Sequence, residues 1–408
     1  MIVLLLFIFS ALLLGSFHLG AVSVRVIVSI VMICFLIFRR KKTNYVPLKK
    51  SPLIIYSIFL LIALICKMLS SSLSGLDEVS PYATRLLAYF LLCYIAYIAI
   101  DRITISTTDI RKIFILLCGI CVFNDIVTYL QYTGNDIGVG LGMMFYTTES
   151  DYLKKVVENF SRLDEIKIAM PGIFGHGAVN GYMVSTLGIL PMYFLLGNGR
   201  KYWKLGFVLF IISLVGAYCC QERAGFGLLL LFALFSIWKF SANLLKFAVP
   251  TFIVLFILAY YDNIANLILT QDIGRYTELT KFEDDRIILL NNALEFIQKN
   301  LLLGGDVLYS NTYGLTPHNV IFHAFVYSGL FGAIVVLYLT FHMLRDSFRI
   351  IKISNAGTVT YFFACALTIY LLNGLVHSSS LITGDVIIWI LYASMLRSKQ
   401  LEIKKFRI

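Results

Sequence analysis

Long apolar runs separated by short polar stretches make up most of this chain. A helix needs about 20 apolar residues to cross a bilayer, and runs of about 17 to 25 residues with few charges recur along the whole sequence. Their approximate bounds are 1–17, 22–38, 52–70, 84–100, 113–131, 171–197, 203–220, 225–239, 244–261, 318–344, 358–376 and 380–396. The pattern predicts an all-α integral membrane protein with about twelve transmembrane helices, arranged as a single polytopic domain over residues 1–408.

Two polar connections are longer than the others, residues 133–170 and 262–317. Loops of this length usually carry function or structure of their own. In the second loop, residues 280–283 read Thr-Lys-Phe-Glu, the pattern of a helix capping box. The apolar residues that follow recur with helical spacing: Ile287, Leu290, Leu294 and Ile297. We therefore expect an amphipathic helix over about 286–300 that lies on or against the membrane domain.

Lysine and arginine gather in alternate connections between the predicted spans. These connections are 39–50, 102–112, 200–204, 239–246, 345–352 and 397–407. Short cytoplasmic loops retain basic residues. We therefore expect both termini and these connections on the cytoplasmic side, and both long loops on the opposite side. The first apolar run lacks a cleavage motif and is interpreted as a retained span.

The composition supports this assignment and excludes several other classes of protein. With 59% hydrophobic and 14% charged residues, the chain is far more apolar than an ordinary soluble domain. The net charge of +11 is scattered over separate short loops, so we attribute it to topology and to attraction for anionic membrane lipids, and expect no nucleic-acid partner. All eight cysteines lie in or at the ends of apolar runs. The outer loops hold no Asp-x-Asp motif, and we expect neither disulfides nor a metal site.

Four short stretches place polar side chains at the outer ends of predicted spans, where such groups are costly without a role. They are Glu222 and Arg223 in the turn 221–225, His176 and Asn180 at the start of the sixth span, Arg286 at the head of the loop helix, and His318 and Asn319 at the head of the tenth span. Because His176 and Asn180 are four residues apart, we expect them on one helix face.

Each candidate also has an ordinary structural interpretation, and the sequence leaves both open. A side chain that reaches lipid phosphates would explain Arg223. An ion pair with a neighbouring acidic residue or with a lipid headgroup would explain Arg286, and a helix-end position would explain His176. An N-terminal helix cap would explain the pair His318 and Asn319.

Two arginines and a histidine on one side of a membrane suit one kind of chemistry. The guanidinium fork matches phosphate oxygens and neutralises charge on a leaving phosphate, and histidine takes a proton from an attacking hydroxyl near neutral pH. We therefore expect Arg223, Arg286 and His318 to act on a lipid-linked pyrophosphate donor attacked by a sugar hydroxyl. The other candidates are expected to bind substrate: Asn319, His176, Asn180 and Glu222. Three carboxylates are candidates for the general base by location: Glu222, Glu283 and Asp306.

The order of these features resembles the bacterial O-antigen polymerase and O-antigen ligase superfamily. The shared signature is His318-Asn319, nine residues, Gly329, two residues and Gly332, preceded by a short outer turn with an arginine and a large late outer loop with an Arg-headed amphipathic segment. The motifs cover residues 171–332, and the topology covers the whole chain. One departure is Gln221-Glu222 before Arg223, where the family often has small hydroxyl residues.

The resemblance implies a large helical periplasmic loop between spans nine and ten, and an active site on the periplasmic side of the inner membrane. It implies transfer of oligosaccharide from an undecaprenyl-pyrophosphate-linked donor to an acceptor, without metal, nucleotide sugar or other cofactor, and allows a polysaccharide chain-length regulator as a further partner. The Tyr- and Asn-rich loop favours a polymerase, whose acceptor is the terminal sugar of another lipid-linked repeat unit. A ligase that transfers polysaccharide to the lipid A core stays an alternative.

A flippase or other transporter of lipid-linked oligosaccharide is an alternative from another class. It predicts charges along a path inside the spans. The predicted spans contain few charges beyond Lys67, Asp125 and Asp385, and the other polar groups gather at one surface, so we favour an enzyme.

Overall fold

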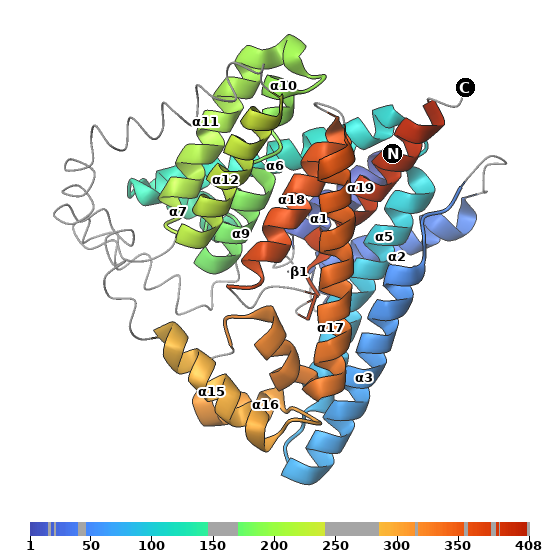
Figure 1. Cartoon of the computed structure of the whole chain (residues 1–408), viewed down its shortest axis with the longest axis vertical. Helices are drawn as coiled ribbons and strands as arrows, with labels where there is room; N and C mark the ends of the chain where they lie inside the picture. Colours follow the sequence, from blue (N-terminus) through green and yellow to red (C-terminus); the bar gives the residue numbers. More distant parts are fainter. Residues whose placement is uncertain are drawn as a thin grey trace. The chain divides into compact units, whose positions relative to one another are not determined.

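The computed structural model describes residues 1–14, 18–19, 22–39, 46–145, 170–240, 285–314, 317–354, 358–376, 381–382 and 384–405. Within these ranges the regular structure is helical, apart from the antiparallel pair β1 (His18–Leu19) and β2 (Val22–Ser23) (Figure 1). The predicted helical class is therefore confirmed. The expected span 244–261 and most of the loop 133–170 lie outside the described residues.

Five segments are long and apolar enough to cross a membrane. They are α3 (Ser51–Ser74), α6 (Thr107–Tyr132), Gly177–Leu196, α12 (Arg223–Phe240) and α17 (Val320–Ile353). Gly177–Leu196 comprises α9 (Gly177–Leu187) and α10 (Met192–Leu196). Shorter apolar helices are α1 (Ile2–Leu13), α2 (Val24–Phe38), α11 (Trp203–Cys219) and α18 (Val359–Asn373). These helices suggest a membrane protein; the expected number of twelve spans stays a prediction.

The chain divides into two compact units. Unit 1 comprises Met1–Ile113, Glu283–Lys352 and Tyr370–Ile408, and unit 2 comprises Phe114–Phe282 and Ile353–Ile369. Among the candidate residues, Arg286, His318 and Asn319 belong to unit 1, as do the carboxylates Glu283 and Asp306. His176, Asn180, Glu222 and Arg223 belong to unit 2.

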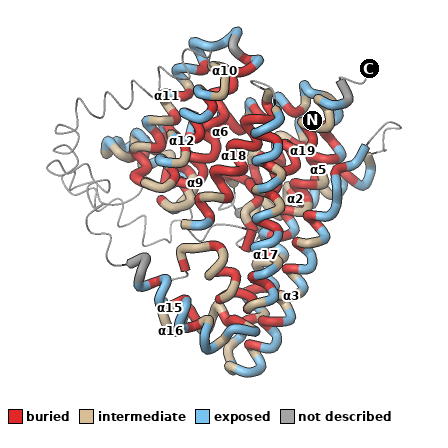
Figure 2. The backbone as a smooth tube through the Cα atoms, in the orientation of Figure 1, coloured by how far each residue is buried: buried red, intermediate tan, exposed pale blue. Residues whose placement is uncertain are grey.

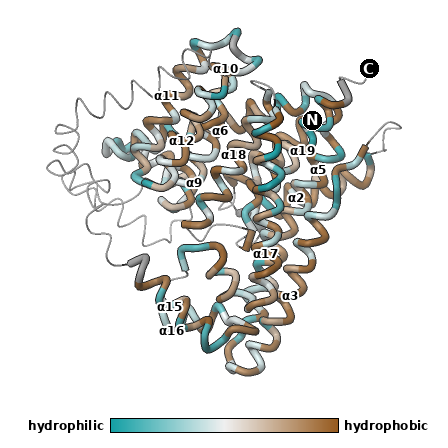
Figure 3. The backbone as a smooth tube through the Cα atoms, viewed as in Figure 1, coloured by the Kyte–Doolittle hydropathy of each residue, from teal (hydrophilic) through white to brown (hydrophobic). Residues whose placement is uncertain are grey.

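Unit 1 has an aromatic core beneath apolar outer faces. α19 (Val386–Lys405) packs on α5 (Leu91–Ile103). The fully buried ring of Trp389 lies 4.9 Å from Tyr56 and 5.8 Å from Tyr97, measured between ring centroids. The outer face of α3 instead exposes large apolar residues at helical spacing: Ile54, Ile58, Leu61, Ile65 and Met68 (Figures 2 and 3). A continuous exposed apolar stripe is unusual on a soluble protein and suits contact with lipid chains.

α17 is broken near its start. At about 1.5 Å per residue a helix of this length would measure about 51 Å, well beyond the roughly 30 Å hydrocarbon core. Its backbone leaves the helical region at Ser328 (φ −145°, ψ 17°) and Gly329 (φ 63°, ψ −168°). The turn after α15 supplies partners for the freed groups: Gly305 N–H donates to Val326 C=O at 2.7 Å, and Leu330 N–H donates to Leu301 C=O at 2.8 Å. The break therefore separates a short first segment, 320–327, from a helix of membrane length.

Gly329 is the residue at which this break should be most sensitive to substitution. Its backbone conformation is nearly exclusive to glycine and costs other residues about 1–3 kcal/mol, and an added Cβ would lie 2.0 Å from the Leu302 carbonyl oxygen. We expect Gly329→Ala to lower the thermal midpoint of the purified protein clearly. The control is Gly119→Ala in α6, where an added Cβ meets nothing within 4 Å. Equal midpoints for the two variants would contradict the role of Gly329.

The loop helix forms as predicted but packs with a different face. α15 runs from Asp285 to Lys299, close to the expected 286–300. Its buried residues are Leu289, Ala293 and Phe296, whereas Leu290 and Leu294 are 39% and 41% exposed. The side that packs within the protein is therefore not the face that the spacing marked. The reason is that α15 has two apolar faces: Phe296 packs edge-on against Tyr309 of α16 (Asp306–Tyr313), with ring centroids 5.2 Å apart. The predicted capping box, 280–283, lies outside the described residues.

Candidate functional site

In unit 2, a tight turn fixes the start of α12 and with it Arg223. Gln221 has φ 60°, which reverses the chain between α11 and α12, and its backbone N–H donates to Tyr218 C=O at 3.0 Å. An added Cβ at Gly181 of α9 would lie 2.4 Å from Cγ of the buried Glu222. An added Cβ at Gly225 would lie 2.9 Å from the Gly181 carbonyl oxygen. The backbone on both sides of Arg223 is therefore held closely against α9.

The same contacts bring the predicted residues of unit 2 together. Met170 N–H donates to Cys220 C=O at 3.1 Å, and the Cys220 thiol lies 3.7 Å from the Gly177 carbonyl oxygen. The turn that carries Glu222 and Arg223 is thus tied to the start of α9, which carries His176 and Asn180.

The expectation that His176 and Asn180 share one helix face is wrong. His176 lies just before the helix, is exposed, and caps it, with Nδ1 accepting from Ala178 N–H at 3.2 Å. Asn180 is fully buried. Its Nδ2 donates to Thr128 Oγ1 at 3.0 Å and to Met170 C=O at 2.8 Å, and its Oδ1 accepts from Asn124 Nδ2 at 2.7 Å. The helix-end interpretation thus fits His176, and Asn180 has structural partners.

Polar residues on α6 complete this network. Asn124 Oδ1 accepts from Ile173 N–H at 2.9 Å, and the Gln131 side chain both donates to Gly172 C=O at 2.9 Å and accepts from its N–H at 2.8 Å. These bonds fasten the segment 170–173, which leads to His176. A sequence signal for them existed, because Asn124, Thr128 and Gln131 fall at helical spacing inside an apolar run.

In unit 1, Asn319 is the N-terminal cap of α17. Its Oδ1 accepts from Ile321 N–H at 2.8 Å, and its Nδ2 donates to Leu375 C=O at 2.8 Å. Val320 N–H also donates to Gly374 C=O at 2.9 Å. The capping interpretation is therefore confirmed for Asn319, and half-buried His318 precedes it. Arg286 is the second residue of α15; its side chain lies outside the described residues.

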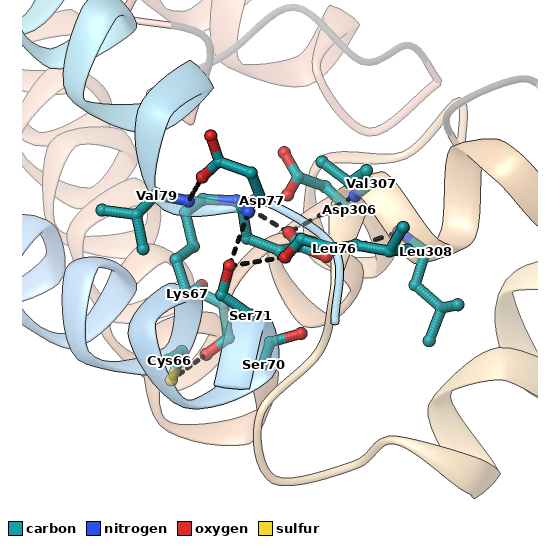
Figure 4. A network of polar contacts seen from close by, with 12 residues as sticks. Cys66, Lys67, Ser70, Ser71, Leu76, Asp77, Val79, Asp306, Val307 and Leu308 are labelled. Atoms are coloured by element: carbon teal, nitrogen blue, oxygen red, sulfur yellow. Dashed lines mark hydrogen bonds and ion pairs between the residues drawn. The ribbon is translucent and has the colours of Figure 1, made fainter. Parts of the chain in front are cut away.

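Unit 1 also holds a cluster of charged side chains at the start of α16, of which Figure 4 shows Lys67 and Asp306. Lys67 of α3 is 2% exposed and forms an ion pair with Asp306 of α16. Lys67 Nζ also lies 3.7 Å from a Glu78 carboxylate oxygen and 4.0 Å from the centre of the Tyr327 ring. Arg85 is the last residue of α4 (Val79–Arg85), and its Nη1 lies 4.0 Å from Asp306 Oδ2. We define Lys67, Glu78, Arg85 and Asp306 as the unit 1 charge cluster.

The two carboxyl groups of this cluster have different pKa values. Burial, with the hydrogen bond and negative charge of Asp306, raises the pKa of Glu78 to about 7. Burial also raises the pKa of Asp306, but the hydrogen bond with Glu78 and the charges of Lys67 and Arg85 outweigh it and bring this pKa below its usual value. Asp306 is therefore the more acidic member of the pair, and below about pH 7 the protonated Glu78 donates to its carboxylate.

The cluster was only partly visible in the sequence. Lys67 stood out as a charge inside an apolar run and Asp306 as a carboxylate in the outer loop, whereas Glu78 and Arg85 carried no distinguishing pattern. The pairing joins residues 239 positions apart, which only the tertiary fold reveals. Its partners make Asp306 a poor general base, because the ion pair stabilises the carboxylate.

No protein-family model matches the chain, and the comparison with curated proteins finds no match. The resemblance to the O-antigen polymerase and ligase superfamily therefore depends on the residues and their order. Because Arg223 belongs to unit 2 and His318 to unit 1, their expected convergence on one substrate also stays a prediction.

Proposed function

We propose that this protein is an O-antigen (surface polysaccharide) polymerase of the bacterial inner membrane. It would transfer a growing oligosaccharide from undecaprenyl pyrophosphate to the terminal sugar of another lipid-linked repeat unit. The observation that supports this most is the architecture of the segment 318–332, where a polar pair heads a broken apolar helix. There Asn319 caps the helix and fixes the backbone beside His318, and Gly329 accepts the close approach of the outer-loop turn.

In the proposed reaction, His318 takes the proton from the acceptor hydroxyl as its oxygen attacks the anomeric carbon of the donor. The bond between this carbon and the pyrophosphate oxygen breaks, and the electron pair leaves with undecaprenyl pyrophosphate. Arg223 and Arg286 stabilise the charge that develops on the leaving group. This proposal assigns no step to a metal or cofactor.

The other candidate residues take supporting roles in this proposal. Asn180 and Asn319 keep the segments that carry His176 and His318 in place through the hydrogen bonds of their amide groups. His176 is exposed beside the Arg223 turn, which suits contact with a sugar hydroxyl. Glu222 lies against α9 and is assigned to the positioning of Arg223.

The proposed topology follows the charge pattern of the sequence. Both termini lie in the cytoplasm, and the residues 133–170 and 262–317 lie in the periplasm with the active site. The exposed apolar stripes of α3 and of α17 beyond its break support lipid contact along these helices.

Deletion of the gene tests the proposal through the glycans that remain. We expect loss of long polysaccharide with single repeat units still attached to the lipid core, and recovery when the gene is restored. Complete chains that accumulate on undecaprenyl pyrophosphate would contradict the polymerase and indicate a ligase. Single lipid-linked units retained on the cytoplasmic face would also contradict it and indicate a flippase.

A further inference from the structure

The unit 1 charge cluster is costly to bury. Lys67 and Glu78 are almost completely removed from solvent, and transfer of charged groups from water costs several kcal/mol per ion unless geometry and hydrogen bonds compensate. Neighbouring groups compensate this desolvation cost. Lys67 has Asp306 and the Tyr327 ring, and Arg85, which is 37% exposed, lies 5.5 Å from the centre of the same ring.

The cluster joins parts of unit 1 that are distant in the sequence. Lys67 belongs to α3, Glu78 to the connection between α3 and α4, and Arg85 to α4. Asp306 is the first residue of α16 in the outer loop. Glu78 also lies across the start of α16, where its two oxygens accept from Val307 N–H and Leu308 N–H at 3.4 Å each.

A second set of contacts holds the same part of the loop from the other side. Gly305 N–H donates to Val326 C=O, and Leu330 N–H donates to Leu301 C=O, both at the break in α17. An added Cβ at Gly305 would lie 3.0 Å from Ser70 Oγ of α3. The segment 301–313 is therefore fixed between α3, α4 and α17.

This segment leads directly to His318. α16 ends at Tyr313, and only residues 314–316 separate it from Pro317. Tyr309 in the middle of α16 is fully buried and packs on Phe296. A displacement of α16 would therefore change the path of the chain into His318.

We propose that Lys67, Asp306 and Glu78 form a latch that holds the outer-loop segment 301–313 on α3 and α4 and thereby positions His318. The holding of the segment 301–313 concerns the loop alone, whereas the positioning of His318 rests on the proposed function. Lys67 and Asp306 are positioning residues in this scheme, since they act through α16. This arrangement explains why the charge of Lys67, which is costly in an apolar helix, is present in α3.

The latch should also respond to pH through Glu78. The charged groups that face Glu78 are Lys67 from α3 and Asp306 from α16. Tyr82 and Tyr327 contact Lys67 in turn, and Arg85 contacts Asp306. The pKa of Glu78 is raised from the model-peptide value of 4.5 to about 7 when the latch is closed. A raised pKa favours the closed latch at low pH, and this advantage is lost as pH rises from 4.5 to about 7. The pKa of Asp306 is lowered, so Asp306 stays ionised throughout this window.

Hydrogen–deuterium exchange of the purified full chain in lipid nanodiscs tests the latch without any need for activity. After correction for intrinsic rates, we expect slow exchange in 301–313 of the wild-type protein. Asp306→Asn and Lys67→Met should each raise the exchange rate of 301–313 by about tenfold or more, because a buried charge loses its partner. Exchange in Val386–Lys405 should stay unchanged as the internal control. Wild-type rates in 301–313 of both variants would overturn the latch.

Two further variants keep the test decisive where a single replacement prevents folding. Glu78→Gln keeps the shape of protonated Glu78, so it should retain protection of 301–313 and lose the change in protection between pH 5 and pH 7. The same pH response as the wild-type protein would overturn the role of Glu78. Exchanging the pair, Lys67→Asp with Asp306→Lys, should restore protection that either single change removes. Absence of any rescue would overturn the ion pair.

Polymer length separates the positioning of His318 from the latch itself. Faster hydrogen–deuterium exchange in 301–313 together with shorter or absent polymer supports both the latch and the positioning of His318. Recovery of polymer in the double variant Lys67→Asp with Asp306→Lys supports a positioning role over a chemical role for Asp306. Loosened exchange with normal polymer would overturn the positioning of His318. If the deletion strain makes normal polysaccharide, the proposed function fails, while the exchange result still decides whether the latch exists.

Discussion

His318→Ala is expected to abolish long-chain polysaccharide while the protein still inserts in the membrane in normal amount. The proposed general base is removed, and loss of such a group typically costs about 10²- to 10⁴-fold in rate. Asn319 caps α17 through its own side chain, so the helix should keep its N-terminal cap in this variant. The measurement is the length distribution of lipid-core-attached polysaccharide in a deletion strain that expresses the variant.

His342→Ala is the matched control for this experiment. His342 lies on the same helix beyond the break, next to Asp346 at 3.5 Å, and falls at the opposite end of the predicted span. We expect it to leave the length distribution unchanged. Normal polymer in His318→Ala would remove the catalytic role, and equal loss in both variants would indicate general damage to α17.

Arg223→Lys and Arg286→Lys are each expected to reduce polymer formation by about 10²-fold or more, although the positive charge is kept. The planar fork of arginine binds two phosphate oxygens at once, and lysine offers a single point charge. The backbone on both sides of Arg223 is held against α9 at Glu222 and Gly225, which restricts where a longer or shorter side chain can reach.

A side chain that only reaches lipid phosphates would tolerate the same exchange. Arg102→Lys is the control, since Arg102 is an exposed residue in the last turn of α5. We expect it to behave like the wild-type protein. Full activity of Arg223→Lys and Arg286→Lys would contradict a bidentate contact and favour the snorkelling interpretation.

The hydropathy pattern predicted the long helices well, because apolar length is a local property. α3 and the second part of α17 match runs that the sequence marks clearly. The break in α17 was not predicted, since Ser328 and Gly329 lie inside an unbroken apolar run. It forms because backbone groups of Leu301 and Gly305, elsewhere in the sequence, replace the missing helical hydrogen bonds.

The face with which α15 packs within the protein was not predicted, for a similar reason. Helical spacing identifies apolar faces, but α15 has more than one, and only the partner determines which is covered. The partner here is Tyr309, which takes Phe296 in an edge-on contact. Leu290 and Leu294 remain exposed.

The candidate residues illustrate what sequence patterns can and cannot assign. The alternative of a helix cap was correct for Asn319, because capping depends on position relative to an apolar run. Asn180 and Asn124 bond across two helices, and Lys67 meets Asp306 across most of the chain. The partner in such a pair cannot be identified from a single sequence, although polar residues inside apolar runs, such as Asn124 and Lys67, mark positions where a partner is needed.

Purified protein in proteoliposomes can be assayed for glycosyl transfer from a polyprenyl pyrophosphate. The substrate is a defined undecaprenyl-pyrophosphate-linked repeat unit, with wild-type protein compared against His318→Ala. We expect products longer by whole repeat units and one undecaprenyl pyrophosphate released for each bond formed, with neither in the variant. Folded wild-type protein that forms no longer product, or equal product from His318→Ala, would contradict the proposed transfer.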